Sequence, residues 1–208
     1  MKKYAYLTLF TKNNKGEYEY LIGLKKFMNI NDGYIGTNPY QYVIPGGNIM
    51  EIENDQTCAV REFEEETGHN LYDLGSQNLI KIFSNKYASF FIAFIPYQNK
   101  DSFIYSKDTI IESGHYPEFE KFEWVKLPKA INKFQKKIDV DKLLIIYFDN
   151  LNNFINKGKP IWVNSNQYQM LKNNDINHEL RISLKKYIKR RLDNGWFIDM
   201  FKEIQKKY

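Results

Sequence analysis

An acidic segment between residues 47 and 69 contains the side chains best suited to chemistry. Its pattern is helical from Asp55 onward. Because residues three and four positions apart are neighbours on a helix, Glu62, Glu65 and Glu66 share one face. Like charges on one face destabilise a helix unless a cation or solvent screens them. Carboxylate oxygens grouped in this way suit Mg²⁺ or Mn²⁺, so we expect a divalent-metal site here.

The residues just before this helix form a glycine loop. Gly46 and Gly47 follow Pro45, and the lack of a Cβ atom lets their backbone approach a ligand closely. Arg61, next to Glu62, can hold a carboxylate through two parallel hydrogen bonds. Together these residue types predict a metal site built from a glycine loop and an acidic helix.

The spacing of this segment resembles the Nudix box, Gly-x5-Glu-x7-Arg-Glu-(apolar)-x-Glu-Glu-x-Gly-(apolar). The matching residues are Gly47, Glu53, Arg61, Glu62, Phe63, Glu65, Glu66 and Gly68. His69 stands where an aliphatic residue is usual, and we expect it to alter packing rather than chemistry. The resemblance covers roughly residues 1–135.

The resemblance implies a Nudix hydrolase: an α/β/α sandwich with a mixed sheet that cleaves a nucleoside diphosphate linked to another group. By position, Glu65 and Glu66 are the main metal ligands, and the Gly46 carbonyl assists them. Glu62 is a further ligand or the base that orients water. The cofactor is Mg²⁺ or Mn²⁺.

The resemblance also implies supporting residues. Arg61 and Glu53 hold the loop and helix in place by ion pairing. A further glutamate often lies shortly before the closing strand of the family, and Glu118 and Glu120 are the candidates for an additional metal ligand or base.

Three residues are candidates for contacts with substrate. Tyr42 lies on the strand that leads into the glycine loop. Its ring is a candidate for stacking on a base, although such residues are more often part of a core or sheet edge. Lys25 closes a strand near the expected phosphate path. Gly47 offers its backbone to the substrate.

Composition places bounds on the class of protein. The 208 residues are 43% hydrophobic and 26% charged, as in ordinary globular proteins. The single cysteine, Cys58, excludes an intramolecular disulfide, and we expect a small buried side chain rather than a nucleophile. No apolar run approaches the roughly 20 residues that span a bilayer. With no recognisable signal peptide, we expect an intracellular, cytoplasmic protein without membrane partners.

Periodicity predicts strands, one helix, further strands and then helices. The helix begins at Asp55, with Asn54 or Asp55 as its N-cap, and ends before Gly68. Segments 26–40 and 101–117 read as irregular. The expected strands are residues 2–11, 18–25, 41–44, 78–83, 87–96 and 122–127. We expect one further helix to start near residue 128, and three more to span residues 141–156, 179–192 and 196–205.

Charge divides the chain unevenly. Residues 1–125 have a net charge of −5 and residues 126–208 a net charge of +10. We expect a Nudix domain over residues 1–137 and a basic helical extension over 138–208 that packs on or beside it.

The extension contains a basic cluster, which consists of Lys185, Lys186, Lys189, Arg190 and Arg191. One hypothesis is a surface that binds RNA. The alternative is an amphipathic helix whose apolar residues pack inward while the lysines remain in solvent.

Three functions follow from these patterns. The first is hydrolysis of the pyrophosphate bond in a nucleotide sugar, a dinucleotide or a nucleoside triphosphate. The second is a Nudix-type hydrolase of the 5′ cap of mRNA, in which the basic helices hold the RNA. The third is an inactive module that senses a nucleotide, against which the intact Glu62, Glu65 and Glu66 argue. The sequence predicts no oligomeric state.

Overall fold

The structure is a computed structural model that describes residues 3–76, 78–193 and 195–207. The chain divides into two compact units. The first comprises Met1–Leu24, Tyr42–Lys136 and Gly195–Tyr208, and the second comprises Lys25–Gln41 and Lys137–Asn194. This division differs from the two expected segments, because residues 25–41 belong with the later helices and residues 195–208 belong with the sheet.

The first unit is built on a mixed sheet of seven strands, counted over the described residues. Neighbouring strands follow the order β3-β2-β1-β6-β5, with β4 paired to β1 and β7 paired to β2. The strands are β1 (Tyr4–Lys12), β2 (Tyr18–Lys25), β3 (Tyr42–Val43), β4 (Gly46–Asn48), β5 (Leu79–Ser84), β6 (Ala88–Phe94) and β7 (Phe119–Lys126). Residue 2, the expected start of the first strand, lies outside the described residues.

The centre of the sheet is the parallel pair β1 and β6, in which Tyr4 faces Ala88 and Phe10 faces Phe94. The other paired strands for which a register is known run antiparallel. Strand β6 is buried along nearly its whole length. A strand that is buried on both faces needs apolar residues throughout, so the expected central strand over 87–96 is confirmed.

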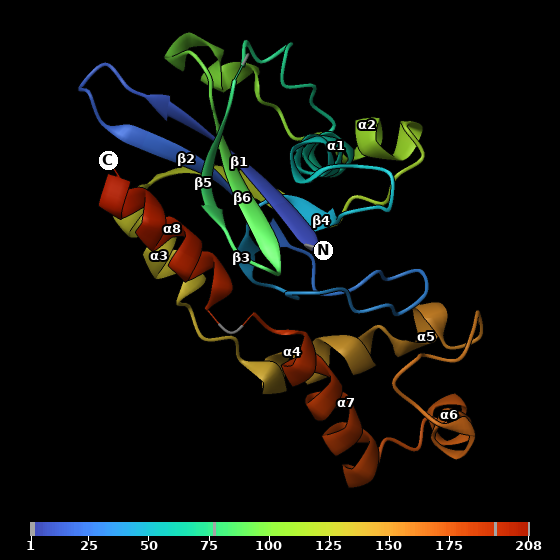
Figure 1. Cartoon of the computed structure of the whole chain (residues 1–208). Coiled ribbons are helices and arrows are strands. Elements are labelled where there is room, and N and C mark those ends of the chain that lie inside the picture. The colour runs from blue at the N-terminus through green and yellow to red at the C-terminus, as the bar shows by residue number, and fades with distance from the viewer. Residues whose placement is uncertain (1–2, 77, 194, 208) are drawn as a thin grey trace. The chain divides into compact units, whose positions relative to one another are not determined.

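Helices cover both faces of the sheet, as Figure 1 shows for α1 on one face and α3 and α8 on the other. Alternate residues of β6 face opposite sides. Phe91 packs with Phe63 of α1 (Asp55–Thr67), whereas Phe90 packs with Phe201 of α8 (Trp196–Lys207). Phe134 of α3 (Leu127–Phe134) lies against Phe201, with ring centroids 4.8 Å apart. The result is the expected α/β/α sandwich.

The ends of α1 are fixed by local chemistry. The Asn54 side chain accepts hydrogen bonds from the amides of Gln56 and Thr57, which otherwise lack partners in the first turn. Gly68 ends the helix at a φ of +74° in the left-handed region, where glycine avoids the strain of a Cβ atom. Both ends agree with the sequence pattern.

The segment between β6 and β7 is more ordered than we expected. It contains η1 (Tyr97–Ser102) and α2 (Lys107–Glu112). The Ser106 side chain caps α2 by accepting from the Thr109 amide at 3.2 Å. Helices this short leave too few residues to show a clear period, so the pattern did not reveal them.

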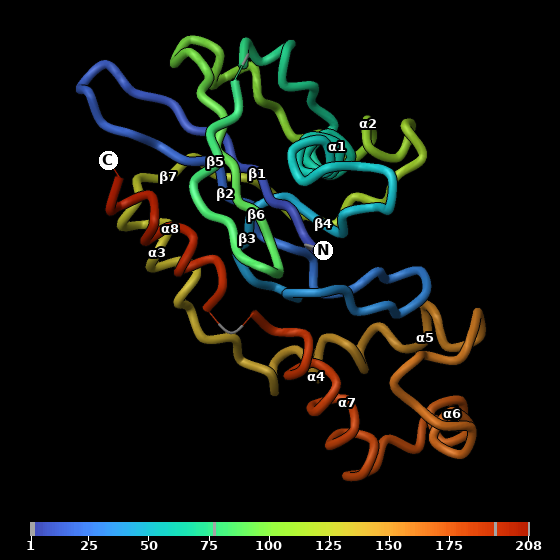
Figure 2. The backbone as a smooth tube through the Cα atoms, in the orientation of Figure 1, coloured from blue at the N-terminus to red at the C-terminus, as the bar shows by residue number. Residues whose placement is uncertain are grey.

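The second unit has its own helices and core, traced in Figure 2 from α4 to α7. Its helices are α4 (Val140–Asp149), α5 (Leu151–Phe154), α6 (Ser165–Lys172) and α7 (His178–Arg191). Tyr147 and Phe154 are buried in its core, with ring centroids 5.1 Å apart. The expected helix over 141–156 is interrupted at Asn150, whose side chain donates to the Ile146 carbonyl at 2.8 Å. Over the described residues, none of the helices has the length and apolar character required to cross a membrane.

Candidate active site

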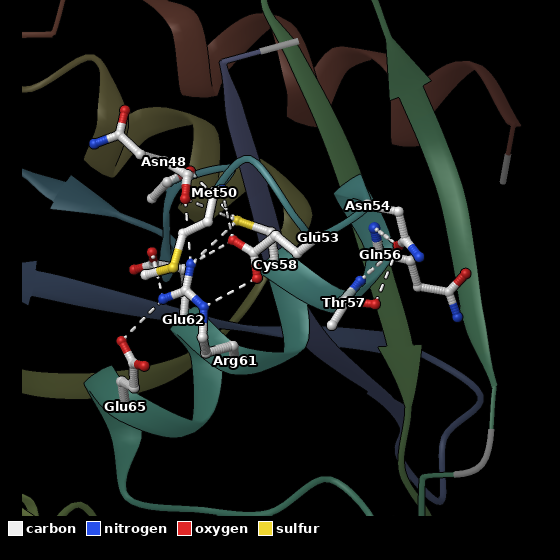
Figure 3. Close-up of polar contacts among 11 residues, drawn as sticks. Asn48, Met50, Glu53, Asn54, Gln56, Thr57, Cys58, Arg61, Glu62 and Glu65 are labelled. Atoms are coloured by element: carbon white, nitrogen blue, oxygen red, sulfur yellow. Dashed lines mark hydrogen bonds and ion pairs between the residues drawn. The ribbon is translucent and has the colours of Figure 1, made fainter. Parts of the chain in front are cut away.

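The site lies where β4, the following loop and α1 meet in the first unit. Gly46 and Gly47 belong to β4, Glu53 lies in the loop, and Arg61 projects from α1. Figure 3 shows the Arg61 side chain pointing toward Glu53, with Glu62 and Glu65 on its other side. The capped start of α1 therefore fixes the direction in which the acidic face is presented.

Arg61 connects the loop to the helix. Its Nη2 donates to Glu53 Oε1 at 2.7 Å and its Nε donates to Glu53 Oε2 at 3.1 Å. Its Nη2 also lies 3.2 Å from the Asn48 carbonyl oxygen. Its Nη1 lies 2.9 Å from Glu62 and 3.1 Å from Glu65. The expected ion pair between Arg61 and Glu53 is present, and it extends to two more carboxylates.

Glu53 is held as an anion. The hydrogen bonds from Arg61, together with one from the Met50 amide at 2.8 Å, lower the pKa of Glu53 to about 2 against the opposing effect of burial. The same pairing with Glu53 raises the pKa of Arg61 above its usual value. This pair is therefore charged throughout the neutral range, as a fixed scaffold requires.

Glu62 sits against the glycine loop. A Cβ atom added to Gly47 would lie 2.4 Å from the Glu62 carboxylate, so only glycine leaves this space to the acid. Burial raises the pKa of Glu62, and the nearby charges of Glu65 and Glu118 raise it further, while Arg61 opposes them. A carboxylate with a raised pKa is a better proton acceptor, which suits a general base.

Glu66 is buried, with 8% of its surface exposed. Its Oε2 accepts a hydrogen bond from the Gly46 amide at 2.8 Å. Gly46 has a φ of +154° and lies so close to β1 that a Cβ atom would be 2.4 Å from the Ala5 carbonyl oxygen. The glycine thus fixes the position of a carboxylate through its amide.

The donor chemistry of the site fits a hard cation. Glu62, Glu65 and Glu66 offer oxygen ligands from one helix, the donor type that hard divalent cations prefer. Among the described residues, however, no three acidic, histidine or cysteine side chains converge as a metal centre. Glu62 and Glu65 instead contact Arg61. In these ion pairs each carboxylate contacts Arg61 through one of its two oxygens.

The two additional candidates before the closing strand differ in their surroundings. The negative charge of Glu118 lies near enough to Glu62 to raise its pKa. Glu120 forms an ion pair with Lys107 at 3.1 Å. The electrostatic coupling favours Glu118 as the acid that belongs to the site.

Tyr42 belongs to a different network. Its hydroxyl donates to Glu123, and Lys133 Nζ lies 4.1 Å from its ring centroid and 3.0 Å from its hydroxyl oxygen. Both the hydroxyl and one face of the ring therefore already have partners within the protein. Lys25 ends β2 as a buried side chain with 7% of its surface exposed, and its amide donates to the Gln41 carbonyl at 3.0 Å.

Two contacts of the site had no signal in the sequence. The Asn48 carbonyl accepts from Arg61, and a backbone oxygen carries no residue-type signature. The Cys58 thiol lies 3.3 Å from the same oxygen. Cys58 is fully buried, as expected, and burial together with nearby carboxylates raises its thiol pKa to about 12, which disfavours the reactive thiolate form.

His69 occupies the position where the box usually has an aliphatic residue. Its ring lies 4.7 Å from the ring of Phe103, and its Nε2 lies 2.9 Å from the Ile104 carbonyl oxygen. It therefore packs at the end of α1, away from the acidic face, as expected.

The basic cluster lies on α7 in the second unit. Leu180, Leu184 and Ile188 form the buried stripe of this helix. Lys186, Lys189 and Arg190 are exposed. The remaining two members have partners: Lys185 pairs with Asp141 at 2.6 Å, and Arg191 contacts Tyr187. The helix is amphipathic, and binding of RNA by its exposed basic residues stays a prediction.

A family model for the NUDIX domain matches residues 14–145, which is more than half of the chain. The chain therefore belongs to the Nudix family, and it is a pyrophosphohydrolase of that family. Nudix hydrolases generally require divalent metal ions. No curated protein matches the chain.

Several solved structures are similar to this chain at low sequence identity. A Caenorhabditis elegans Ap4A hydrolase in a binary complex has 19% identity and a TM-score of 0.44, covering 74% of this chain and 100% of its own. A mutT/nudix family protein from Listeria innocua has 19% identity and a TM-score of 0.44, covering 67% and 87%. The Escherichia coli dihydroneopterin triphosphate pyrophosphohydrolase has 15% identity and a TM-score of 0.41, covering 65% and 90%.

Proposed function

We propose that this protein hydrolyses the pyrophosphate bond of a small nucleoside diphosphate derivative, such as a nucleotide sugar, a dinucleotide or a nucleoside triphosphate, with Mg²⁺ or Mn²⁺ as cofactor. The observation that carries the proposal is the acidic face of α1, where Glu62, Glu65 and Glu66 lie beside a glycine loop that a larger residue would fill. An inactive module has no chemical reason to keep three carboxylates on this face of the helix.

The donor set assigns separate roles to these acids. Glu65 and Glu66 would hold the metal, and Gly46 would support them through its backbone. When bound, a divalent cation would supply neutralisation of the pyrophosphate charge and a lowered pKa of water. Glu62, whose pKa is raised, accepts the proton of the attacking water or completes the ligand set.

Arg61 and Glu53 are positioning residues. Their two hydrogen bonds fix the loop against the helix, so the glycine backbone and the carboxylates keep one geometry. Arg61 also neutralises Glu62 and Glu65 when no cation is bound, which offsets the repulsion between them.

The experiment is a substrate panel with the full chain. Nucleotide sugars, dinucleotides, nucleoside triphosphates and capped RNA are each incubated with Mg²⁺, with Mn²⁺ and with EDTA, and the products are separated by chromatography. Metal-dependent cleavage of one or more of the small substrates supports the proposal. Faster cleavage of capped RNA than of every small substrate would replace it with the cap-hydrolase alternative.

A matched variant tests whether the acidic face performs the reaction. Glu65→Gln keeps the size of the side chain and removes its charge, while Glu64→Gln makes the same change at the neighbouring position, off the face that carries the proposed ligands. Loss of turnover in Glu65→Gln, with turnover retained in Glu64→Gln, is the expected result. Equal turnover in both variants contradicts the ligand assignment.

A further inference from the structure

The second unit contains a cavity of about 230 Å³ that is formed by its own residues. Three separate parts of the chain line it: residues 32–35, residues 157–162 and Tyr187 of α7. The combination of aromatic and basic side chains in this lining is the feature that points to a ligand.

Aromatic rings form much of the cavity surface. Tyr34, Trp162 and Tyr187 all line it, and Tyr34 is 49% exposed. The guanidinium of Arg191 lies over two of these rings, 5.7 Å from the centroid of Tyr34 and 5.0 Å from that of Tyr187. Exposed rings beside a cation provide a surface on which a flat, electron-rich group can stack.

Hydrogen bonds hold the backbone of Tyr34 and the side chains of Trp162 and Tyr187. The Tyr34 amide donates to the Asp32 carboxylate at 2.8 Å, and its carbonyl accepts from the Asn29 amide at 2.8 Å. Trp162 Nε1 donates to the buried Tyr147 hydroxyl at 2.9 Å. Arg191 Nη2 donates to the Tyr187 hydroxyl at 2.8 Å. These contacts order the Tyr34 backbone and two of the three rings before a ligand binds, which lowers the entropic cost of binding.

The charge around the cavity is positive. Lys157 and Lys159 line it and are exposed, against a single lining carboxylate, Asp32, among the described residues. On α7 the exposed Arg190 lies three positions from Tyr187 and therefore on the same side of the helix, which adds positive charge beside the cavity. Cations beside a stacking surface match the phosphates that precede and follow a nucleotide in a strand.

We propose that this cavity binds one unpaired nucleotide of single-stranded RNA. The base stacks on Tyr34 and its neighbouring rings, and Lys157 and Lys159 contact the adjoining phosphates. A base inside a duplex cannot reach such a surface, because its faces are covered by its neighbours. The two Asp32 carboxylate oxygens already accept from the Tyr34 amide and the Asn29 side chain, and their remaining lone pairs are the acceptors for the 2′-hydroxyl, the group that distinguishes RNA from DNA. This site does not depend on the hydrolytic reaction of the first unit.

The test measures binding by the full chain to a fluorescein-labelled single-stranded RNA of 12 nucleotides, by anisotropy in EDTA, so that no hydrolysis occurs. Tyr34→Ala is expected to weaken binding at least about 5-fold, and Tyr34→Phe to preserve it, because stacking needs the ring and not the hydroxyl. The double variant Lys157→Ala with Lys159→Ala is expected to reduce the slope of log K against log salt by about 1.4, for two phosphate contacts.

The controls remove the same side-chain types elsewhere on the surface. Tyr72→Ala, at a position 78% exposed, and the double variant Lys15→Ala with Lys86→Ala are expected to bind like the natural chain. Thermal melting establishes whether each variant is folded. If Tyr34→Ala does not fold, the double variant Lys157→Ala with Lys159→Ala tests the proposal instead. The proposal is overturned by equal affinity for duplex RNA or single-stranded DNA, by equal losses in the controls, or by no difference between Tyr34→Ala and Tyr34→Phe.

Discussion

Arg61 binds Glu53 across the loop that precedes the catalytic helix, through hydrogen bonds of 2.7 Å at Nη2 and 3.1 Å at Nε. Both side chains are mostly buried, with 23% and 9% of their surfaces exposed. The same guanidinium contacts Glu62 and Glu65. One residue thus links the shape of the glycine loop to the charge of the proposed metal site.

Replacing Arg61 with lysine is expected to lower stability by about 1–3 kcal/mol, because an ammonium cannot reproduce the two-pronged contact with Glu53. Turnover is expected to fall more than about 10-fold, since each 1.4 kcal/mol lost in the transition state is tenfold in rate. Denaturant unfolding and steady-state kinetics measure these effects. Lys126→Ala, which removes an exposed pair with Glu17, is the control and is expected to leave stability nearly unchanged because solvent screens the pair.

Gly47→Ala is expected to abolish most activity with little change in melting temperature. The new methyl group displaces the Glu62 carboxylate, a flexible side-chain end that can move without disturbing the backbone. Gly36→Ala, where a Cβ atom would meet nothing within 4 Å, is expected to behave like the natural chain. A Gly47→Ala protein that retains full turnover would show that the position of Glu62 does not matter for catalysis.

Binding of Mn²⁺ is expected to weaken at least about 10-fold in Glu66→Gln, since one charged oxygen ligand becomes a neutral amide. Mn²⁺ titration followed by electron paramagnetic resonance measures the affinity directly, without a substrate. Glu112→Gln, an exposed acid at the end of α2, serves as the control. Equal affinities in the two variants would remove Glu66 from the ligand set.

Glu118→Gln is expected to reduce turnover and to lower the pKa of Glu62, because it removes one of the negative charges that raise that pKa. The acidic limb of the pH–rate profile should therefore move to lower pH. Glu120→Gln, two residues away, loses only its pair with Lys107 and should leave the limb unchanged. The same movement of the acidic limb in both variants would mean that Glu118 does not act on Glu62 more strongly than Glu120 does.

The network around Glu123 predicts a dependence of stability on pH. Burial opposes ionisation of Glu123, but hydrogen bonds from Lys121, Lys133 and Tyr42 outweigh it and lower its pKa from 4.5 to about 2. A depressed pKa stabilises the folded state above the unfolded pKa, and this contribution is lost as pH falls from about 4.5 to about 2.

The destabilisation caused by Glu123→Gln should therefore be largest near neutral pH and should shrink through that acidic window. Urea unfolding of both proteins at several pH values provides the measurement. A difference in unfolding free energy that is constant with pH would mean that the charge of Glu123 does not contribute to the stability of the folded protein.

Much of the catalytic helix could be predicted from sequence because its signals are local. Asn54 and Gly68 mark its ends, and the positions of Cys58 and Phe63 define its buried face. The ion pair of Arg61 with Glu53 was implied by the resemblance to the Nudix box. These features depend on neighbours within one or two helical turns.

Features that depend on contacts between distant residues could not be predicted from the sequence. The engagement of Tyr42 by Glu123 and Lys133 joins residues more than 80 positions apart. Helix α6 is short, and its start is marked by Asn164 and Gln167, a capping box too brief to stand out from a polar segment. The place of α8 depends on which apolar surface accepts Phe197 and Phe201, and that surface exists only once the sheet has formed.

The position of α8 also has a consequence for biosynthesis. Phe197, Met200 and Phe201 cover one face of the central sheet, yet they lie beyond the residues of the second unit in the chain. While the ribosome is still making that second unit, the sheet already exposes Phe90 and Ile92 with no helix α8 to cover them. The residues of the proposed active site are translated early. The first unit can nevertheless reach its final packing only after α8 has left the ribosome.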